Sequence, residues 1–175
     1  YFEEKVSINN PSGLKRLQYA WSIEDVMPVY AFFSAGKSYK IVNRNSNKSL
    51  DVNSSSTEKG APIIQWEYGG KNNQLWALQS TTEGYTTISN KNSLKLLDAN
   101  DAPVSAGSRI IQLEDSGKAS QQWQVTDIGF GYYKIINRNS GLSLDVNGGS
   151  ANNGTDIIQW YWNRGANQQW LIAEP

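Results

Sequence analysis

The sequence predicts an all-β protein in which three copies of one unit form a three-fold closed body. Asp98 follows Asp51 by 47 residues and Asp145 follows Asp98 by the same number, without a gap. Three tryptophans keep the same spacing at positions 76, 123 and 170. Each copy contains four short β-like runs, about twelve strands in all, and no segment has sustained helical periodicity. An internal period of this kind defines the architecture before any local assignment.

Every unit follows one order of elements. A first strand over 39–43, 86–90 or 133–137 ends at a polar turn of the type Asn-Arg-Asn-Ser or Asn-Lys-Asn-Ser. A short second strand lies at 49–52 and at the corresponding positions of the other two units. A loop rich in Ser, Asn and Gly then leads to a glycine that can take a positive φ, namely Gly60, Gly107 or Gly154. A third strand (63–66, 110–113, 157–160) and a fourth strand carrying the triplet Gln-x-Trp complete the unit.

One unit of this length cannot bury its own apolar face, so the three units are expected to share a core. The candidates are positions that are apolar in all three copies. They are Ile41, Ile88 and Ile135; Leu50, Leu97 and Leu144; Ile63, Ile110 and Ile157; and Trp76, Trp123 and Trp170.

Composition excludes several classes of function. Sixteen basic and sixteen acidic residues give a net charge of zero, which provides no electrostatic case for binding nucleic acid or an anionic membrane. The chain has no His and no Cys, so His- and Cys-dependent catalysis, His/Cys metal sites and disulfides are excluded. No apolar run approaches the length of a membrane helix. We therefore expect no metal, no cofactor and no membrane span.

The repeat defines two regions. Residues 37–175 form the repeat domain, with units at about 37–83, 84–130 and 131–175. Residues 1–36 lie outside it but contain apolar runs at 19–23 and 29–33, so they are expected to be an N-terminal extension packed on the repeat body or the end of an upstream domain. Because the first residue is Tyr1, we expect a processed product or a piece of a longer chain.

The repeated motifs resemble a known family. Gln-x-Trp recurs at 74–76, 121–123 and 168–170, together with Leu-Asp-Val and Gln-Trp-x-aromatic. Over roughly residues 37–174 this pattern is similar to the ricin-B-type lectins, the β-trefoil carbohydrate-binding modules of family 13. The absence of cysteine makes the chain look more like the bacterial modules attached to glycoside hydrolases and toxins. The resemblance therefore implies a β-trefoil, a secreted protein and a covalently attached upstream domain.

In that family each unit can form one shallow sugar pocket. An Asp and an Asn-Gln pair hydrogen-bond vicinal hydroxyls, an aromatic residue stacks on the sugar ring, and the Gln-x-Trp tryptophan is structural. The implied carbohydrate-binding residues are Asp51, Trp66, Asn73 and Gln74 in the first unit and Asp145, Trp160, Asn167 and Gln168 in the third. Tyr68 and Trp162 should point to the same side of the strand two residues later, so they are the alternative stacking residues, although the earlier position is favoured.

The second unit has lost part of this set. It keeps Asp98 and Gln121 but has Leu113 in place of the stacking tryptophan and Ser120 in place of the asparagine. Losing a stacked aromatic forfeits about 1 kcal/mol beyond its area, so this degenerate site should be weak or silent. Leu113 also indicates that Trp66 and Trp160 are surface residues, because a core requirement would have kept a large aromatic residue in every unit.

These patterns predict non-catalytic carbohydrate binding through repeats 1 and 3, and the family resemblance implies galactose-type, arabinose-containing or xylan-type ligands. The role would be to hold an attached hydrolase or toxin near a glycan. Enzyme activity of this chain is not expected, because the motif aspartates belong to separate units, whereas glycosidases use a close carboxylate pair. Two alternatives remain open. The chain is a β-trefoil protein-interaction module, or it is the C-terminal part of a glycoside hydrolase whose catalytic domain lies outside it. The aspartates also have a structural alternative, which is to cap turns.

Overall fold

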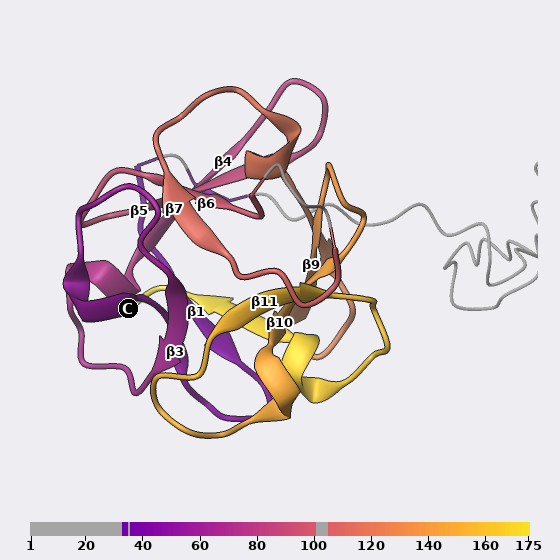
Figure 1. Cartoon of the computed structure of the whole chain (residues 1–175). Coiled ribbons are helices and arrows are strands. Elements are labelled where there is room, and N and C mark those ends of the chain that lie inside the picture. The colour runs from indigo at the N-terminus through magenta and orange to yellow at the C-terminus, as the bar shows by residue number, and fades with distance from the viewer. Residues whose placement is uncertain (1–32, 35, 101–104) are drawn as a thin grey trace, which may run out of the picture.

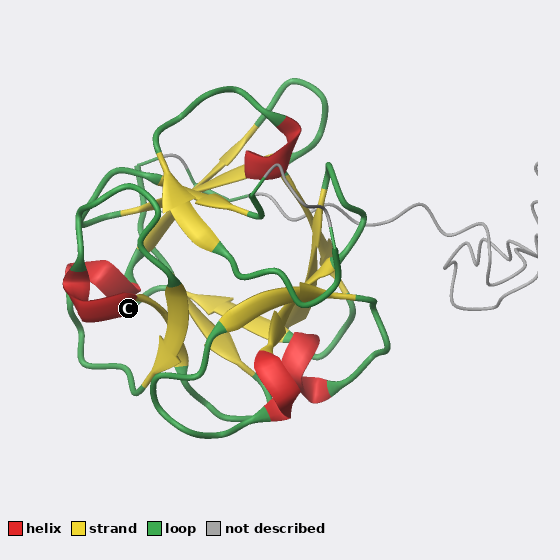
Figure 2. Cartoon of the chain, viewed as in Figure 1, coloured by secondary structure: helices red, strands yellow, loops and turns green. Residues whose placement is uncertain are grey.

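The computed structural model describes residues 33–34, 36–100 and 105–175, so residues 1–32 of the predicted extension lie outside the described part. The described chain forms twelve short strands with three-fold arrangement around a central axis (Figures 1 and 2). Within these residues no helix has the length and apolar character needed to cross a bilayer.

Six strands form a closed barrel. They are β1 (Lys40–Asn43), β4 (Trp76–Ser80), β5 (Thr86–Asn90), β8 (Trp123–Asp127), β9 (Tyr132–Asn137) and β12 (Trp170–Ala173). All neighbours pair antiparallel in the order β1, β12, β9, β8, β5, β4. An antiparallel bridge between Tyr39 and Trp76 joins β4 back to β1 and closes the ring. Closure leaves the barrel without an unpaired strand edge.

The other six strands form three hairpins that cap the barrel. They are β2 (Ser49–Val52) with β3 (Ile63–Trp66), β6 (Leu96–Asp98) with β7 (Ile111–Leu113), and β10 (Ser143–Val146) with β11 (Ile157–Trp160). Single bridges connect the hairpins pairwise: Pro62 with Ile111, Ile64 with Asp156, and Arg109 with Ile158. A six-stranded barrel capped by three hairpins is the β-trefoil, so the predicted fold class is confirmed.

The shared core is the predicted one. All twelve register-equivalent Ile, Leu and Trp positions have no solvent exposure. Each motif tryptophan also donates its indole N–H to a leucine carbonyl of the second strand in its own unit. The three Nε1–O distances are 3.0 Å for Trp76 and Leu50, 3.0 Å for Trp123 and Leu97, and 3.1 Å for Trp170 and Leu144. This bond satisfies a buried donor and joins each hairpin to the barrel.

One feature differs from the prediction. The triplet Gln-x-Trp does not lie within a strand, because its glutamine ends a short 3₁₀ turn and the strand begins at the tryptophan. These turns are η2 (Asn72–Gln74), η3 (Ala119–Gln121) and η5 (Ala166–Gln168), and two further turns, η1 (Asn53–Ser55) and η4 (Asn147–Gly149), follow the second strands. Three-residue turns have no hydrophobic periodicity, so the pattern that predicts longer helices could not find them.

Candidate functional site

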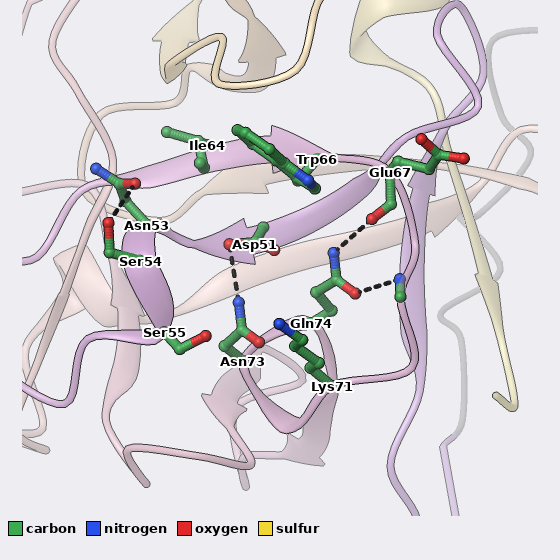
Figure 3. A pocket seen from close by; sticks show the side chains of 11 residues that line it. Asp51, Asn53, Ser54, Ser55, Ile64, Trp66, Glu67, Lys71, Asn73 and Gln74 are labelled. Atoms are coloured by element: carbon green, nitrogen blue, oxygen red, sulfur yellow. Dashed lines mark hydrogen bonds between the residues drawn. The ribbon is translucent and has the colours of Figure 1, made fainter.

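Two pockets occur at equivalent places in the first and third units. The first has a volume of about 390 Å³ and lies between η1, β3 and η2 (Figure 3). The second has a volume of about 440 Å³ and lies between η4, β11 and η5. Asp51, Trp66, Asn73 and Gln74 line the first pocket, and Asp145, Trp160 and Asn167 line the second. The fold therefore brings seven of the eight primary candidates to a pocket wall, and the exception is Gln168.

The two pocket tryptophans face solvent. Trp66 and Trp160 end their strands and are 46% and 42% exposed, whereas the preceding residues Gln65 and Gln159 are fully buried. This alternation follows from the two-residue period of a strand. An indole held half-exposed on a strand provides a flat apolar plate.

Each plate lies close to the backbone of a neighbouring unit at one of its ring atoms. Cζ3 of Trp66 lies 3.6 Å from the place where a Cβ of Gly154 would be, and Cζ3 of Trp160 lies 3.6 Å from that of Gly107. Both glycines have positive φ values, of 80° and 92°, which a residue with a side chain adopts only with strain. The predicted positive-φ glycines of the repeat thus support the tryptophans across unit boundaries.

A buried carboxylate lies beside each plate. Asp51 is in β2, paired with Ile64 of β3, and its Oδ1 accepts a hydrogen bond of 2.9 Å from Nδ2 of Asn73. Asp145 Oδ2 accepts from Asn167 Nδ2 at 3.0 Å and from Gln168 Nε2 at 2.7 Å. In both units a side-chain amide orients the carboxylate, in place of the backbone N–H bonds of a turn cap.

Burial raises the pKa of both carboxylates. Removal from water raises the pKa of Asp51 to about 6, against the opposing effects of hydrogen bonds from Gln74 and Asn73 and the positive charge of Lys71. Burial likewise raises the pKa of Asp145, with hydrogen bonds from Gln168 and Asn167 opposing it. Each pocket therefore contains a carboxylate whose ionised form is disfavoured by removal from water.

The motif glutamines hold loops. Gln74 donates from Nε2 to the carbonyl of Glu67 at 2.8 Å and accepts at Oε1 from the Gly69 N–H at 2.7 Å. Gln121 and Gln168 make the same pair of backbone contacts in their own units. Because the degenerate second unit keeps them, these bonds serve the fold, and in the third unit Gln168 also donates to Asp145.

Tyr68 and Trp162 do not line the pockets. Both are half-buried, and the ring of Tyr68 lies 5.1 Å below the ammonium group of Lys40. The expectation that they share the outward side of the strand assumed a continuing strand, but β3 and β11 end at Trp66 and Trp160. Beyond a strand end the two-residue period no longer fixes the direction of a side chain.

The second unit is built differently around its aspartate. Asp98 Oδ1 accepts a bond of 2.6 Å from the backbone N–H of Asn100, which is the turn-capping role. Leu113 is half-buried, and the hydroxyl of Ser120 is buried without a hydrogen-bond partner among the described residues. The neighbouring residues 101–104 lie outside the described part of the chain.

The sequence analysis missed several pocket residues. The loops of η1 and η4 form one wall of each pocket, through residues 53–55 and 147–149. Glu67 and Lys71 line only the first pocket, and Asn163 lines only the second. The loop residues could have been found from their position, because each loop directly follows the strand that contains Leu-Asp-Val. Within the described residues no group of three or more acidic side chains offers a metal site.

The fold and the chain's relatives define a lectin-type β-trefoil domain. Residues 20–113 and 119–175 match the family described as "Ricin-type beta-trefoil lectin domain-like". Because this match spans most of the chain, the protein belongs to that family. The match begins before residue 37, where the repeat was expected to start.

Solved structures agree with this assignment. A designed three-fold symmetric protein, ThreeFoil, is 42% identical with a TM-score of 0.77, over 79% of this chain and 99% of that one. An exo-β-1,3-galactanase from Clostridium thermocellum is 38% identical with a TM-score of 0.79, over 82% of this chain but only 31% of the galactanase. A Macrolepiota procera ricin B-like lectin in complex with lactose shares the fold at 24% identity, with a TM-score of 0.70 over 83% of this chain and all of that one. A search of the curated protein sequences finds no significant match.

Proposed function

We propose that this chain is a non-catalytic carbohydrate-binding domain with two working sites, one in the first unit and one in the third. The observation that carries the proposal is the pairing, in each of two pockets, of a solvent-facing indole with a buried aspartate. A sugar ring has an apolar face of C–H groups and a rim of hydroxyls, so it needs an aromatic plate and fixed polar groups together. Trp66 with Asp51 and Trp160 with Asp145 provide this combination.

The binding step follows from the chemistry of these groups. The ring stacks on the exposed indole face, and two neighbouring hydroxyls donate to the carboxylate, which forms stronger hydrogen bonds than a neutral acceptor. Asn73 and Asn167 hold the carboxylate in place through their Nδ2 groups. Shallow open pockets of this kind give affinities of about 4 to 6 kcal/mol, or roughly millimolar to tens of micromolar.

Galactose-type sugars are the first ligands to test, with arabinose-containing glycans and xylan as the next candidates. This order is supported by the 38% identity to part of a β-1,3-galactanase. The chain spans about a third of that enzyme, which supports the proposal that the domain targets an attached hydrolase or toxin to a glycan outside the cell. Two weak sites on one body would then gain affinity for a polymer through avidity.

A glycan array followed by titration calorimetry tests the proposal. We expect binding to galactose-containing glycans, with two sites per chain. The double variant Trp66→Ala, Trp160→Ala should lose all binding while remaining folded. An array without hits, combined with capture of a defined protein by the same surface, would favour the protein-interaction alternative.

A further inference from the structure

The polar turns after the first strands of the first and second units contact a pocket outside their own unit. Their asparagines bond to residues around the pocket of the preceding unit in the ring. The turn that follows β5, at residues 90–93 of the second unit, contacts the first pocket, and the turn that follows β1, at residues 43–46 of the first unit, contacts the third pocket. The third pocket is thus contacted by residues that lie more than a hundred positions earlier in the sequence.

The first asparagine of the turn holds the 3₁₀ turn that carries the pocket asparagine. Asn90 donates from Nδ2 to the carbonyl of Asn73 at 3.0 Å, and Asn43 donates to the carbonyl of Asn167 at 2.9 Å. Both turn asparagines are fully buried. The Oδ1 of Asn43 also accepts from the backbone N–H groups of Asn45 and Ser46, at 3.0 and 3.3 Å, which fixes the turn itself.

The second asparagine holds the opposite wall of the pocket. Asn92 donates from Nδ2 to the carbonyl of Ser55 at 3.0 Å, and Asn45 donates to the carbonyl of Gly149 at 2.8 Å. Ser55 and Gly149 belong to the loops η1 and η4 that line the two pockets. Asn45 and Asn92 are otherwise exposed, so these two hydrogen bonds are what connects each side chain to its pocket loop.

The loop η1 is strained, and η4 lies against a residue of the site. In η1, Ser54 and Ser55 have φ values of 57° and 53°, in the left-handed region that L-residues avoid. In η4, a Cβ on Gly149 would lie 3.9 Å from Cγ of Asn167, the residue that orients Asp145. A loop in such a conformation needs external contacts to remain in place.

A glutamine of the following unit adds a second support. Gln65 donates from Nε2 to the carbonyls of Ser150 and Asn152, both at 2.9 Å, and Ser46 fixes its Oε1 at 2.6 Å. Gln112 makes the same two bonds to residues 56 and 58, and Ser93 fixes it in the same way. These segments continue directly from the pocket loops.

We infer that Asn92 and Asn45 are positioning residues for the saccharide sites, each acting on the pocket of the preceding unit and not on its own. Asn92 sets the wall of the first site, and Asn45 sets the wall of the third. The inference rests on the proposed function for its effect on affinity. It makes each site a product of two adjoining units, because the residue that controls a pocket lies in the next copy of the repeat.

The test uses two backgrounds that each leave one site. Trp66→Ala leaves the third site and Trp160→Ala leaves the first. Into each we place Asn45→Asp or Asn92→Asp, which keep the shape but remove the N–H donor. Asn45→Asp should weaken lactose binding about fivefold at the third site and leave the first unchanged, and Asn92→Asp should do the opposite. Asn139→Asp, the counterpart whose turn follows β9, should change neither site.

A ligand-free measurement separates the two proposals. Amide hydrogen exchange should accelerate in residues 147–149 for Asn45→Asp and in residues 53–55 for Asn92→Asp, with both melting temperatures nearly unchanged. If galactosides, arabinose-containing glycans and xylan all fail to bind but the exchange pattern holds, the proposed function falls and the positioning role stands. Equal effects of one variant on both loops, or on neither, would overturn the inference.

Discussion

The indole of Trp66 in the first unit covers the backbone of Gly154 in the third, with Cζ3 3.6 Å from where a Cβ would be. Trp160 and Gly107 repeat this relationship between the third and second units. Part of each indole is therefore close to a neighbouring unit, while Trp66 and Trp160 remain 46% and 42% exposed to solvent. The packing of the indole against the protein and its contact with a sugar therefore involve different parts of the side chain.

Replacing a plate should therefore remove binding without unfolding the protein. Trp160→Ala should reduce affinity at the third site at least tenfold, because a stacked aromatic contributes about 1 kcal/mol beyond its area and the area itself is also lost. Calorimetry measures the affinity, and thermal unfolding should shift by only a few degrees. Trp170→Ala is the contrasting variant, because it empties a fully buried position and should destabilise by about 3–5 kcal/mol. A similar loss of stability in Trp160→Ala would mean that its indole belongs to the core.

The second unit has room for the missing plate. Its Leu113 occupies the position of Trp66 and Trp160, and the glycine that would support an indole there, Gly60, has φ 79° and no heavy atom within 4 Å of a built Cβ. Leu113→Trp combined with Ser120→Asn should raise the number of sites from two to three in calorimetric titration. Leu113→Trp alone serves as the control, because it restores the plate without the amide that orients the aspartate. An unchanged stoichiometry in the double variant would contradict the explanation given for the silent unit.

Binding at the first site should weaken on acidification. Asp51 has a pKa of about 6 in the folded protein, and its ionised form is the acceptor for hydroxyls. Affinity should therefore fall as the pH drops through about 6, measured by calorimetry in the Trp160→Ala background. A rise in affinity at low pH would show that the protonated carboxyl is the binding form.

The same group should affect stability with the opposite sign. Burial raises the pKa of Asp51 above the unfolded value of about 4, so the folded state binds more protons between about pH 4 and 6. The contribution of Asp51 to the free energy of unfolding is therefore fully present below about pH 4 and is lost as the pH rises to about 6. Asp51→Asn should flatten this part of the stability profile in chemical denaturation. A profile that keeps its slope would assign the effect to other groups.

Leu94 should be replaceable with a gain in stability. It has φ 61° and is 79% exposed, whereas the equivalent positions hold Asn47 at 56° and Gly141 at 68°. Leucine in the left-handed region costs about 1–2 kcal/mol, and asparagine tolerates this region much better. Leu94→Asn should therefore raise the free energy of unfolding by about 1 kcal/mol, and the reverse change Asn47→Leu should lower it by a similar amount. No gain in Leu94→Asn would mean that the leucine is stabilised by a contact of its own.

The sequence predicted the fold almost completely, because the same pattern occurs three times and each copy can be compared with the other two. Twelve core positions recur with the same apolar character, and all twelve are buried. The short 3₁₀ turns before the motif tryptophans escaped prediction, because a three-residue turn is set by hydrogen bonds from residues such as Gln74 to a loop and not by hydrophobic periodicity.

The candidate site was predicted only in part. The sequence, through its family resemblance, indicated the tryptophan and the aspartate of each pocket, and both residues lie in regular strands. It could not fix the directions of Tyr68 and Trp162, because the strands end just before them. It also could not tell that the amide groups of Gln74 are taken up by the backbone of its own loop.

The sequence alone determined the three-fold all-β architecture, the composition of its core, and the likeness of the first and third units against the altered second. Only the tertiary structure decided which unit supports which pocket. Asn45 contacts Gly149 and Trp66 lies on Gly154, and nothing in the sequence indicates either contact. The physical reason is that periodicity reports how a residue faces within its own unit, whereas contacts between units depend on how the barrel closes.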